Sequence, residues 1–379
     1  MDSYRGAKLF FLIFILGIGN GSFAQKNLIK KLFSSEQDST RSDSFIPVPL
    51  IGYTQETGVE FGLTGLFSFY TDPQDKENRG STLSGDATYS TEKQSTARIK
   101  TDIWTRKNNY HYQAEVRYKN FPFYFYGVGN QTKEADKDLL IEELQHVVLE
   151  AEKQLSKEYY LGLTTSFDDY SFREKNPGGT FTTDPIRGKH GGKALFIGLS
   201  QIIDNRNSNV YSTKGSYLKL NYSYAPNFFD GENFEGSLFK LDFRTFKTLN
   251  NKLILGVNIN YQTLQGDSAP FYLLPQLGTE MMRGYYTGRF RDQNLLAAQA
   301  ELRYRFMPRF AIIGFIGAGN VYSTGNFVLA ASKPTFGGGF RYFFEVERGL
   351  SISLDYGFGE KRANEARQKG LNICIGQAF

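Results

Sequence analysis

The chain has 379 residues, a formal net charge of +5 and a single cysteine. One cysteine excludes a secreted domain stapled by disulfides, and a modest charge of interleaved sign gives no indication of nucleic-acid binding. The mean hydropathy is −0.41 although aromatic residues make up 16% of the chain, and no late segment has the ~18 consecutive apolar residues of a transmembrane helix. This composition favours a membrane β-barrel, whose strands are half apolar and carry aromatic girdles.

The N-terminus reads as a secretory signal peptide over residues 1–24. Arg5 and Lys8 precede an apolar run at 9–19 that is too short to cross a bilayer as a helix, and Ser22-Phe23-Ala24 supplies small residues at the cleavage positions. We therefore expect cleavage before Gln25. A membrane anchor helix is the alternative, disfavoured by the length of the run. Residues 25–45, rich in Ser, Lys and Asp, are expected to form a disordered periplasmic linker.

The barrel domain is expected over residues 46–379, where apolar and polar residues alternate with the period of a strand. A soluble sandwich would show the same alternation; the signal peptide, the terminal Phe379 and the scarcity of helical segments favour lipid. The alternation predicts an all-β fold, a 16-stranded antiparallel transmembrane β-barrel, and an even number is typical of bacterial single-chain barrels. The expected strands lie near 46–54, 57–71, 80–91, 95–106, 109–120, 141–154, 158–171, 192–203, 214–225, 235–248, 252–264, 294–306, 309–320, 334–345, 349–358 and 370–379.

The segment 136–152 is ambiguous, because its apolar residues also fit an amphipathic helix. We interpret its second half as a strand, since a helix there would leave an odd number of strands.

The connections alternate in length along the chain. With the N-terminus in the periplasm, short turns such as 107–108, 155–157, 249–251 and 307–308 are periplasmic, and the long loops at 121–140, 172–191, 265–293 and 321–333 are extracellular. The loop 265–293 is then the sixth on the outside.

This sixth loop contains Met281-Met282-Arg283-Gly284-Tyr285-Tyr286. Long loops in compact domains are commonly functional, and a glycine allows close backbone approach. In the strand that follows, Gln299, Glu301 and Arg303 share the polar face. An arginine folded into a barrel needs an acidic partner, because an unpaired buried charge is costly. Glu301 lies on the correct face for Arg283; the alternative is an exposed loop arginine and an unrelated lumen carboxylate.

Further motifs flank this loop. Asp204, Arg206 and Thr213-Lys214-Gly215 lie after the eighth expected strand, "GYTQETGVEFG" at 52–62 forms the first hairpin, and "ELRYRF" and "GFIGAGNVY" follow the loop. In this order and spacing the motifs resemble the BamA/TamA superfamily of outer-membrane assembly and translocation barrels, also called the bacterial surface antigen family, over about residues 46–379.

The resemblance implies a lid loop folded into the lumen, with Arg283, Gly284 and Tyr285 as its motif and Glu301 as its partner. It also implies a periplasmic turn motif made of Asp204, Arg206, Lys214 and Gly215, although an ordinary Asx turn with a glycine turn explains those residues equally.

Two departures from the family pattern stand out. Its assembly factors carry periplasmic POTRA modules before the barrel, and residues 25–45 are too short for even one, so we expect a POTRA-less barrel. The family also places Phe-x-Asp in the strand after the lid strand, where this chain has Phe315-Ile316-Gly317. Glu301 is left as the main candidate to hold Arg283.

The first and last strands indicate a weak seam. Pro47 and Pro49 lack the N–H that a ladder needs, which marks a strand edge or merely a strand entry. Phe379 is expected to end the closing strand as a terminal aromatic, and family members open this seam as a lateral gate.

Enzymatic chemistry finds little support. His111, His146 and His190 are scattered without metal-ligand spacing, so we expect no catalytic residues, no metal and no cofactor. The resemblance implies insertion or translocation of proteins or lipids by seam opening in the outer membrane of a Gram-negative cell. The alternatives are a passive or lid-gated solute channel, and a structural partner of another envelope complex. Expected partners are outer-membrane lipid and a periplasmic or outer-membrane protein, with no nucleic acid.

The signal-peptide interpretation predicts that the mature protein begins at Gln25. N-terminal sequencing of protein purified from outer membranes checks this. Intact residues 1–24 in the membrane fraction would contradict it.

Overall fold

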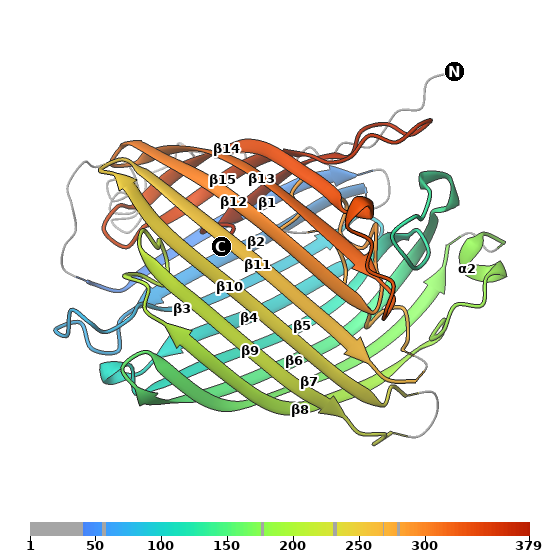
Figure 1. Cartoon of the computed structure of the whole chain (residues 1–379), viewed down its shortest axis with the longest axis horizontal. Coiled ribbons are helices and arrows are strands. Elements are labelled where there is room, and N and C mark those ends of the chain that lie inside the picture. The colour runs from blue at the N-terminus through green and yellow to red at the C-terminus, as the bar shows by residue number, and fades with distance from the viewer. Residues whose placement is uncertain (1–40, 55–57, 176–177, 230–232, 268, 279–280) are drawn as a thin grey trace.

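The computed structural model describes residues 41–54, 58–175, 178–229, 233–267, 269–278 and 281–379. The predicted signal peptide at 1–24 and most of the linker at 25–45 lie outside the described residues. In the described part, sixteen strands follow one another in a single sheet, each hydrogen-bonded to its neighbours in the sequence (Figure 1). The predicted all-β, 16-stranded antiparallel barrel is confirmed. Among the described residues, no helix is long and apolar enough to span a membrane.

The strands agree with the expected ranges to within a few residues at most ends. Their bounds are β1 (Ser44–Thr54), β2 (Gly58–Phe69), β3 (Ser81–Ser90), β4 (Ser95–Trp104), β5 (Tyr110–Phe125), β6 (Asp138–Ser156), β7 (Tyr159–Glu174), β8 (Gly191–Asp204), β9 (Gly215–Ala225), β10 (Gly236–Asn250), β11 (Leu253–Gln265), β12 (Asn294–Met307), β13 (Phe310–Tyr322), β14 (Lys333–Glu345), β15 (Leu350–Phe358) and β16 (Lys369–Ile375). The described helices are a four-residue turn, α2 (Thr180–Thr183), and three 3₁₀ turns.

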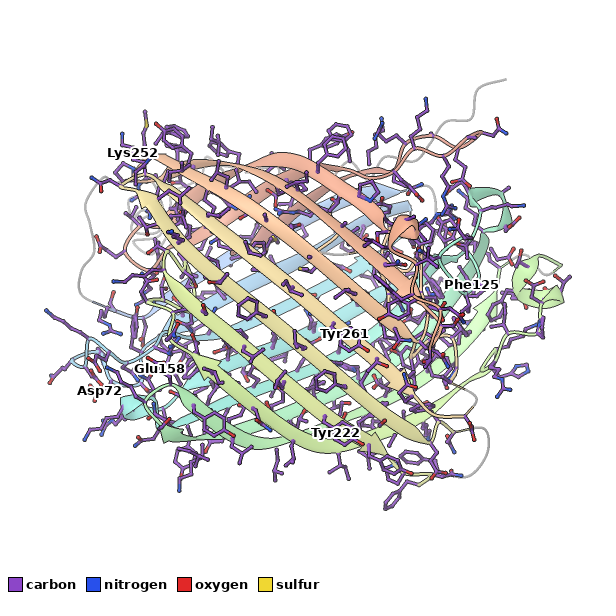
Figure 2. All side chains as sticks on the ribbon, in the orientation of Figure 1. Asp72, Phe125, Glu158, Tyr222, Lys252 and Tyr261 are labelled. Atoms are coloured by element: carbon purple, nitrogen blue, oxygen red, sulfur yellow. The ribbon has the colours of Figure 1, made fainter. Side chains whose placement is uncertain are left out.

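The polarity of the barrel is inverted relative to a soluble domain. Leu163 and Ile316 point outward and are each 66% exposed, whereas Glu152 and Glu301 point into the lumen and are fully buried. Figure 2 shows Tyr222 and Tyr261 on the outer surface of their strands. Apolar residues that alternate with polar ones thus form the lipid-facing side, as in outer-membrane barrels.

The segment that also fitted a helix forms a strand. β6 runs from Asp138 to Ser156 and pairs with β5 from Tyr110–Lys153 to Phe125–Asp138. The strand interpretation of residues 141–154 is therefore confirmed. The ladder formed by β5 overrides the local helical pattern, because it satisfies every backbone group on that edge of β6.

The two ends of the barrel differ in their connections. We call the end with the connections 105–109, 157–158, 251–252 and 308–309 the turn end, and the end with 126–137, 175–190 and 266–293 the loop end. Figure 2 shows Lys252 and Glu158 at the turn end and Phe125 near the loop end. The predicted asymmetry holds for these connections, but the turn end also carries two longer ones, 70–80 and 205–214, and the loop end has a short turn at 91–94.

The C-terminus departs from the expectation. β16 ends at Ile375, and Gly376, with φ of +107°, turns the chain away from the sheet. Phe379 is buried against Phe246 of β10, with ring centroids 6.1 Å apart. The prediction that Phe379 ends the closing strand is wrong. A left-handed glycine breaks the strand direction, and the apolar pocket at Phe246 buries the terminal ring inside the barrel.

The first and last strands meet differently from the other neighbours. β1 pairs with β2 over its whole length and β16 pairs with β15, but in the described part no ladder joins β1 to β16. Ile46 and Val48 of β1 instead share a buried cluster with Phe344 of β14 and with Leu350, which alternates with lumen-facing Ser351 and Ser353 and therefore lies on the outward face of β15. Side-chain packing, rather than main-chain hydrogen bonding, covers this edge of the sheet.

Candidate functional site

The described part of the loop between β11 and β12, within residues 266–293, is folded into the lumen at the loop end. Met282, Arg289 and Phe290 are each completely buried. Met282 and Phe290 belong to one apolar cluster with Leu295 of β12 and Val321 of β13. We call residues 266–293 the lid loop. Burial of its apolar side chains against the inner wall is the non-directional force that holds it there.

Arg283 lies at the centre of the lid loop's contacts. Its Nη2 donates to Glu301 Oε2 at 2.7 Å and its Nη1 donates to Asp355 Oδ2 at 2.6 Å. The guanidinium carbon also lies 3.6 Å from the centre of the Phe315 ring, which adds a cation–π contact. The side chain is 1% exposed. Both ion pairs are therefore shielded from water, where charge-assisted hydrogen bonds are strongest.

Two further arginines complete this network. Arg303 Nε donates to Glu301 Oε1 at 2.8 Å, and Arg341 donates to both carboxylate oxygens of Asp355. Each carboxylate thus lies between two guanidinium groups. We call these five residues the lumen ion network: Arg283, Glu301, Arg303, Arg341 and Asp355. Buried charges are tolerated only when they are paired with good geometry, and every member here has a partner of opposite sign.

The network also binds the C-terminal tail. Arg303 Nη2 donates to the main-chain oxygen of Phe379 at 2.7 Å, and Arg341 Nε donates to Gln377 Oε1 at 3.1 Å. The lid loop and residues 376–379 therefore attach to the same two carboxylate–arginine pairs. Both segments depend on one set of buried charges in the wall formed by β12, β14 and β15.

Gly284 allows the lid loop to approach the wall closely. Its φ is +101°, and a Cβ at this position would lie 2.7 Å from the carbonyl carbon of Gly357 in β15. A side chain would meet backbone atoms that cannot move aside, so only glycine fits both the backbone conformation and the contact.

The tyrosines that follow extend the attachment. The Tyr285 hydroxyl donates to the Pro334 carbonyl and accepts from the Glu360 N–H, both at 2.7 Å. Burial raises the pKa of Tyr285 above its usual range, so the phenol remains a neutral donor. The Tyr286 hydroxyl accepts from the backbone N–H of Tyr124 at 3.0 Å.

Two arginines that the sequence analysis did not single out lie in the same loop. Arg289 donates to Glu365 at 3.1 Å and to the Thr132 carbonyl, which ties the lid loop to two other loops. Arg291 packs among three phenylalanine rings at 5.4–5.8 Å, and burial lowers the pKa of its guanidinium to about 10.

The turn after β8 forms a separate polar cluster at the turn end. Asp204 accepts from Arg206 Nε at 2.9 Å and from Arg79 Nη1 at 2.8 Å. Gly215 has a φ of +94°, and a Cβ there would lie 2.4 Å from the Asn205 carbonyl oxygen. The backbone of Lys214 donates to Asn207, while its side chain is exposed. The predicted motif residues thus meet in one turn, with Arg79 as an additional cation.

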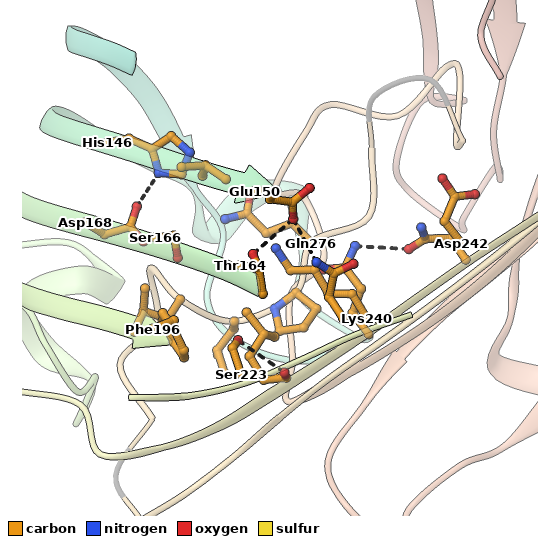
Figure 3. A pocket seen from close by; sticks show the side chains of 18 of the residues that line it. His146, Glu150, Thr164, Ser166, Asp168, Phe196, Ser223, Lys240, Asp242 and Gln276 are labelled. Atoms are coloured by element: carbon orange, nitrogen blue, oxygen red, sulfur yellow. Dashed lines mark hydrogen bonds and ion pairs between the residues drawn. The ribbon is translucent and has the colours of Figure 1, made fainter. Parts of the chain in front are cut away.

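Beneath the lid loop lies a cavity of about 450 Å³. It separates Tyr272–Gln276 of the lid loop from the opposite wall, β6 to β11, and polar and apolar side chains line it in about equal measure (Figure 3). Lumen carboxylates, amides and lysines reach it, among them His146, Glu150, Asp168, Lys240, Asp242 and Gln262. His146 Nδ1 lies 2.6 Å from Asp168, and Glu150 accepts from Asn221 at 2.7 Å. No group of residues with metal-ligand geometry occurs in the part of the chain that the structure describes.

The structure brings together several residues that the sequence analysis named, and it adds Arg341 and Asp355, which the sequence analysis missed, to the lumen ion network. Arg283, Gly284 and Glu301 meet as expected, but Glu301 does not hold the arginine alone. Asp355 supplies the second carboxylate, in place of the acid absent at Gly317. Its alternation with Ser351 and Ser353 already indicated a lumen-facing side chain. Pro47 and Pro49 lie within β1, opposite Gly65 and Leu63 of β2.

Comparison with known proteins identifies the fold family. The Omp85 superfamily domain matches residues 78–379. No curated protein matches the sequence. Among solved structures, BamA from Haemophilus ducreyi lacking POTRA domains 1–3 is similar, with 13% identity, a TM-score of 0.53, and coverage of 89% of this chain and 70% of that one.

Two CdiB structures are similar as well. CdiB from Acinetobacter baumannii has 12% identity and a TM-score of 0.55, with coverage of 88% of this chain and 60% of that one. CdiB from Escherichia coli has 10% identity and a TM-score of 0.56, with coverage of 88% and 62%. The chain thus spans less than two thirds of the CdiB chains, and at these identities the likeness establishes the fold. Because the domain match covers more than half of its length, the chain belongs to the Omp85 superfamily, a family of outer-membrane barrels that serve protein assembly and translocation.

Proposed function

We propose that this barrel assists the insertion or translocation of proteins or lipids at the outer membrane by opening between β1 and β16. The observation that carries the proposal is the edge between these strands. Every other neighbouring pair of strands is joined by a ladder, whereas this pair has none in the described part of the chain. An unpaired strand edge is a template for pairing with another chain.

The prolines of β1 support an edge that is easily opened. Pro47 and Pro49 are two residues apart, so their missing N–H groups fall on the same side of the strand. Because β1 forms a continuous ladder with β2, that side is the free edge of β1, away from β2. Each absent ladder bond removes about 0.5–1.5 kcal/mol of net stabilisation. The edge is therefore weaker than any other contact between strands.

In this proposal the lid loop closes the lumen and Arg283 is its latch. Opening and closing require no chemical step, and no catalytic residue is assigned. With the turn end towards the periplasm, cargo reaches the seam from that side, delivered by a separate periplasmic or outer-membrane partner.

A lid-gated solute channel is the second candidate. The cavity of about 450 Å³ under the lid loop favours it, since a polar lumen in a barrel of this size can carry water and small solutes once the loop leaves. Conductance separates the two candidates. A channel conducts when the lid loop is released, whatever the state of the seam.

Removing both carboxylates that hold Arg283 tests the latch. Glu301→Gln with Asp355→Asn leaves Arg283 buried without an acidic partner, together with Arg303 and Arg341, and each broken buried pair costs about 3–5 kcal/mol. We expect the lid loop to leave the lumen and trypsin to cleave after Arg289 and Arg291, which are shielded in the intact protein. Each single variant keeps one acceptor and is expected to be cleaved more slowly.

Asp242→Asn is the matched control, because it removes a lumen carboxylate that pairs with Arg244 and is not part of the lumen ion network. Cleavage patterns on denaturing gels provide the measurement. A double variant as resistant as the unaltered protein would show that Arg283 does not hold the loop.

Cross-linking tests the seam. The only cysteine of the chain, Cys374 in β16, is replaced by serine, so that only introduced thiols react. In that Cys374→Ser background, Val48→Cys in β1 and Ile375→Cys in β16 place two thiols at one apolar cluster. We expect a short bifunctional thiol reagent to join the two strands. In liposomes, the joined protein should no longer accelerate the folding of an unfolded eight-stranded barrel protein, whereas the unjoined protein should accelerate it.

Val48→Cys in a Cys374→Ser background, treated with the same reagent, controls for modification alone. Equal acceleration by the joined and unjoined proteins would reject seam opening. Conductance in planar bilayers, measured on the same samples and on the lid variants, tests the channel.

A further inference from the structure

The turn end of the barrel carries a one-sided arc of positive charge. Between the β4–β5 turn and the β10–β11 turn, seven basic side chains are exposed and only one acidic side chain, Glu158, is exposed with them. We call these seven residues the basic arc: Arg106, Lys107, Lys153, Lys157, Lys214, Lys247 and Lys252. Figure 2 shows Lys252 and Glu158 at this end of the barrel.

The members of the basic arc are not consumed by internal ion pairs. Within the described residues, no carboxylate lies within ion-pair distance of any of the seven, whereas Arg79 and Arg206 nearby are held by Asp204. On the rest of the turn end, from β12 round to β3, the exposed charges are one lysine, Lys76, against Asp43, Glu77 and Glu347. The exposed positive charges of the turn end therefore gather on the side of the barrel away from the seam.

Two of the lysines point into the lipid rather than towards the periplasmic solution. In β6, Lys153 lies on the outward face with Leu149 and Leu155, which are 51% and 55% exposed. In β10, Lys247 lies on the outward face beside Leu249, which is 48% exposed. A charge on the lipid-facing side is costly unless its ammonium reaches the polar headgroups.

The surroundings place these lysines at the membrane interface. Tyr110 and Tyr112 of β5 are outward-facing and stacked, with ring centroids 6.0 Å apart, at the level of Lys153, which is paired with Tyr110 in the ladder. Tyrosines mark the interface in membrane proteins. The turns that carry the remaining lysines lie just beyond this level. Thr248 donates to the Thr213 carbonyl at 2.9 Å, which holds the Lys214 turn against β10.

We propose that the basic arc binds acidic phospholipid headgroups of the leaflet at the turn end. In each part of the arc, one outward lysine, Lys153 or Lys247, lies on the lipid-facing side and the basic residues of the neighbouring turns lie further from the membrane centre. A headgroup phosphate between them can therefore contact cations on both sides. A soluble acidic protein would meet the turn cations, but the bilayer would keep it from the two outward lysines. Which leaflet the basic arc contacts depends on the orientation assumed in the proposed function. The match between the basic arc and acidic headgroups does not depend on that orientation.

The test compares two triple variants of the full-length protein in non-ionic detergent. Lys153→Gln, Lys157→Gln and Lys247→Gln remove three charges of the basic arc. Lys93→Gln, Lys133→Gln and Lys175→Gln remove three exposed lysines at the loop end. Native mass spectrometry during titration with phosphatidylglycerol or phosphatidylcholine measures the affinity for each lipid, and heat-dependent gel mobility reports folding.

We expect the unaltered protein and the loop-end variant to prefer phosphatidylglycerol. Loss of three interfacial lysines should weaken binding of that lipid by roughly tenfold or more while phosphatidylcholine binding stays unchanged. Added NaCl should reduce the preference of the unaltered protein for phosphatidylglycerol, because salt screens the attraction between charges. This measurement needs no variant, so it tests the proposal even if a variant does not fold.

Equal preference in the two variants, or a preference insensitive to salt, would overturn the proposal. Binding of oligoglutamate by the unaltered protein without any preference for phosphatidylglycerol would also overturn it and identify the arc as a surface for an acidic protein. Failure of this test leaves the seam cross-linking result untouched, because no member of the basic arc lies in β1 or β16.

Discussion

A guanidinium group placed in the interior of a barrel must find carboxylates there, and this requirement organises one whole wall of the molecule. Arg283 reaches two of them, Glu301 and Asp355, and each of these is shared with a second arginine of the wall. The five groups are almost completely buried, so their attraction is little screened by water. This arrangement closes the loop end of the barrel. The last residues of the chain bind to the same charged groups from the side of the turn end.

The closed lumen is therefore asymmetric. The lid loop is bound on the side of β12 to β15, while the open space lies against β6 to β11. The strands that bind the lid loop directly precede β16, so a movement of the last strands displaces Asp355 together with β15. If the seam opens as proposed, its movement is coupled to release of the lid loop through the same carboxylate, and such coupling is reciprocal by thermodynamic necessity.

Much of this architecture could be predicted from the sequence, because consecutive residues of a barrel strand face lipid and lumen in turn and therefore alternate in polarity. Alternation located the strands, including β6 with its competing helical pattern, and the face of Glu301. The partners that were missed are those whose identity depends on the curvature of the sheet. Asp355 lies 72 residues from Arg283 along the chain and meets it where the lid loop packs against β15. Phe379 was misassigned for a similar reason, since a left-handed Gly376 and a cavity wall at Phe246 decide its position, and neither is visible in the period-two pattern of residues 371–375.

The order of the sheet has a consequence for how the chain folds. Each ladder joins strands that follow one another in the sequence. The loop-closure entropy needed to form each ladder is therefore small, and hairpins can be added one at a time. The contacts that do require distant parts of the chain are the lid loop, the tail and the packing of β1 against β14 and β15. These contacts form only after the sheet has curved, so the segments that close the lumen are the last to become ordered and the first available to move.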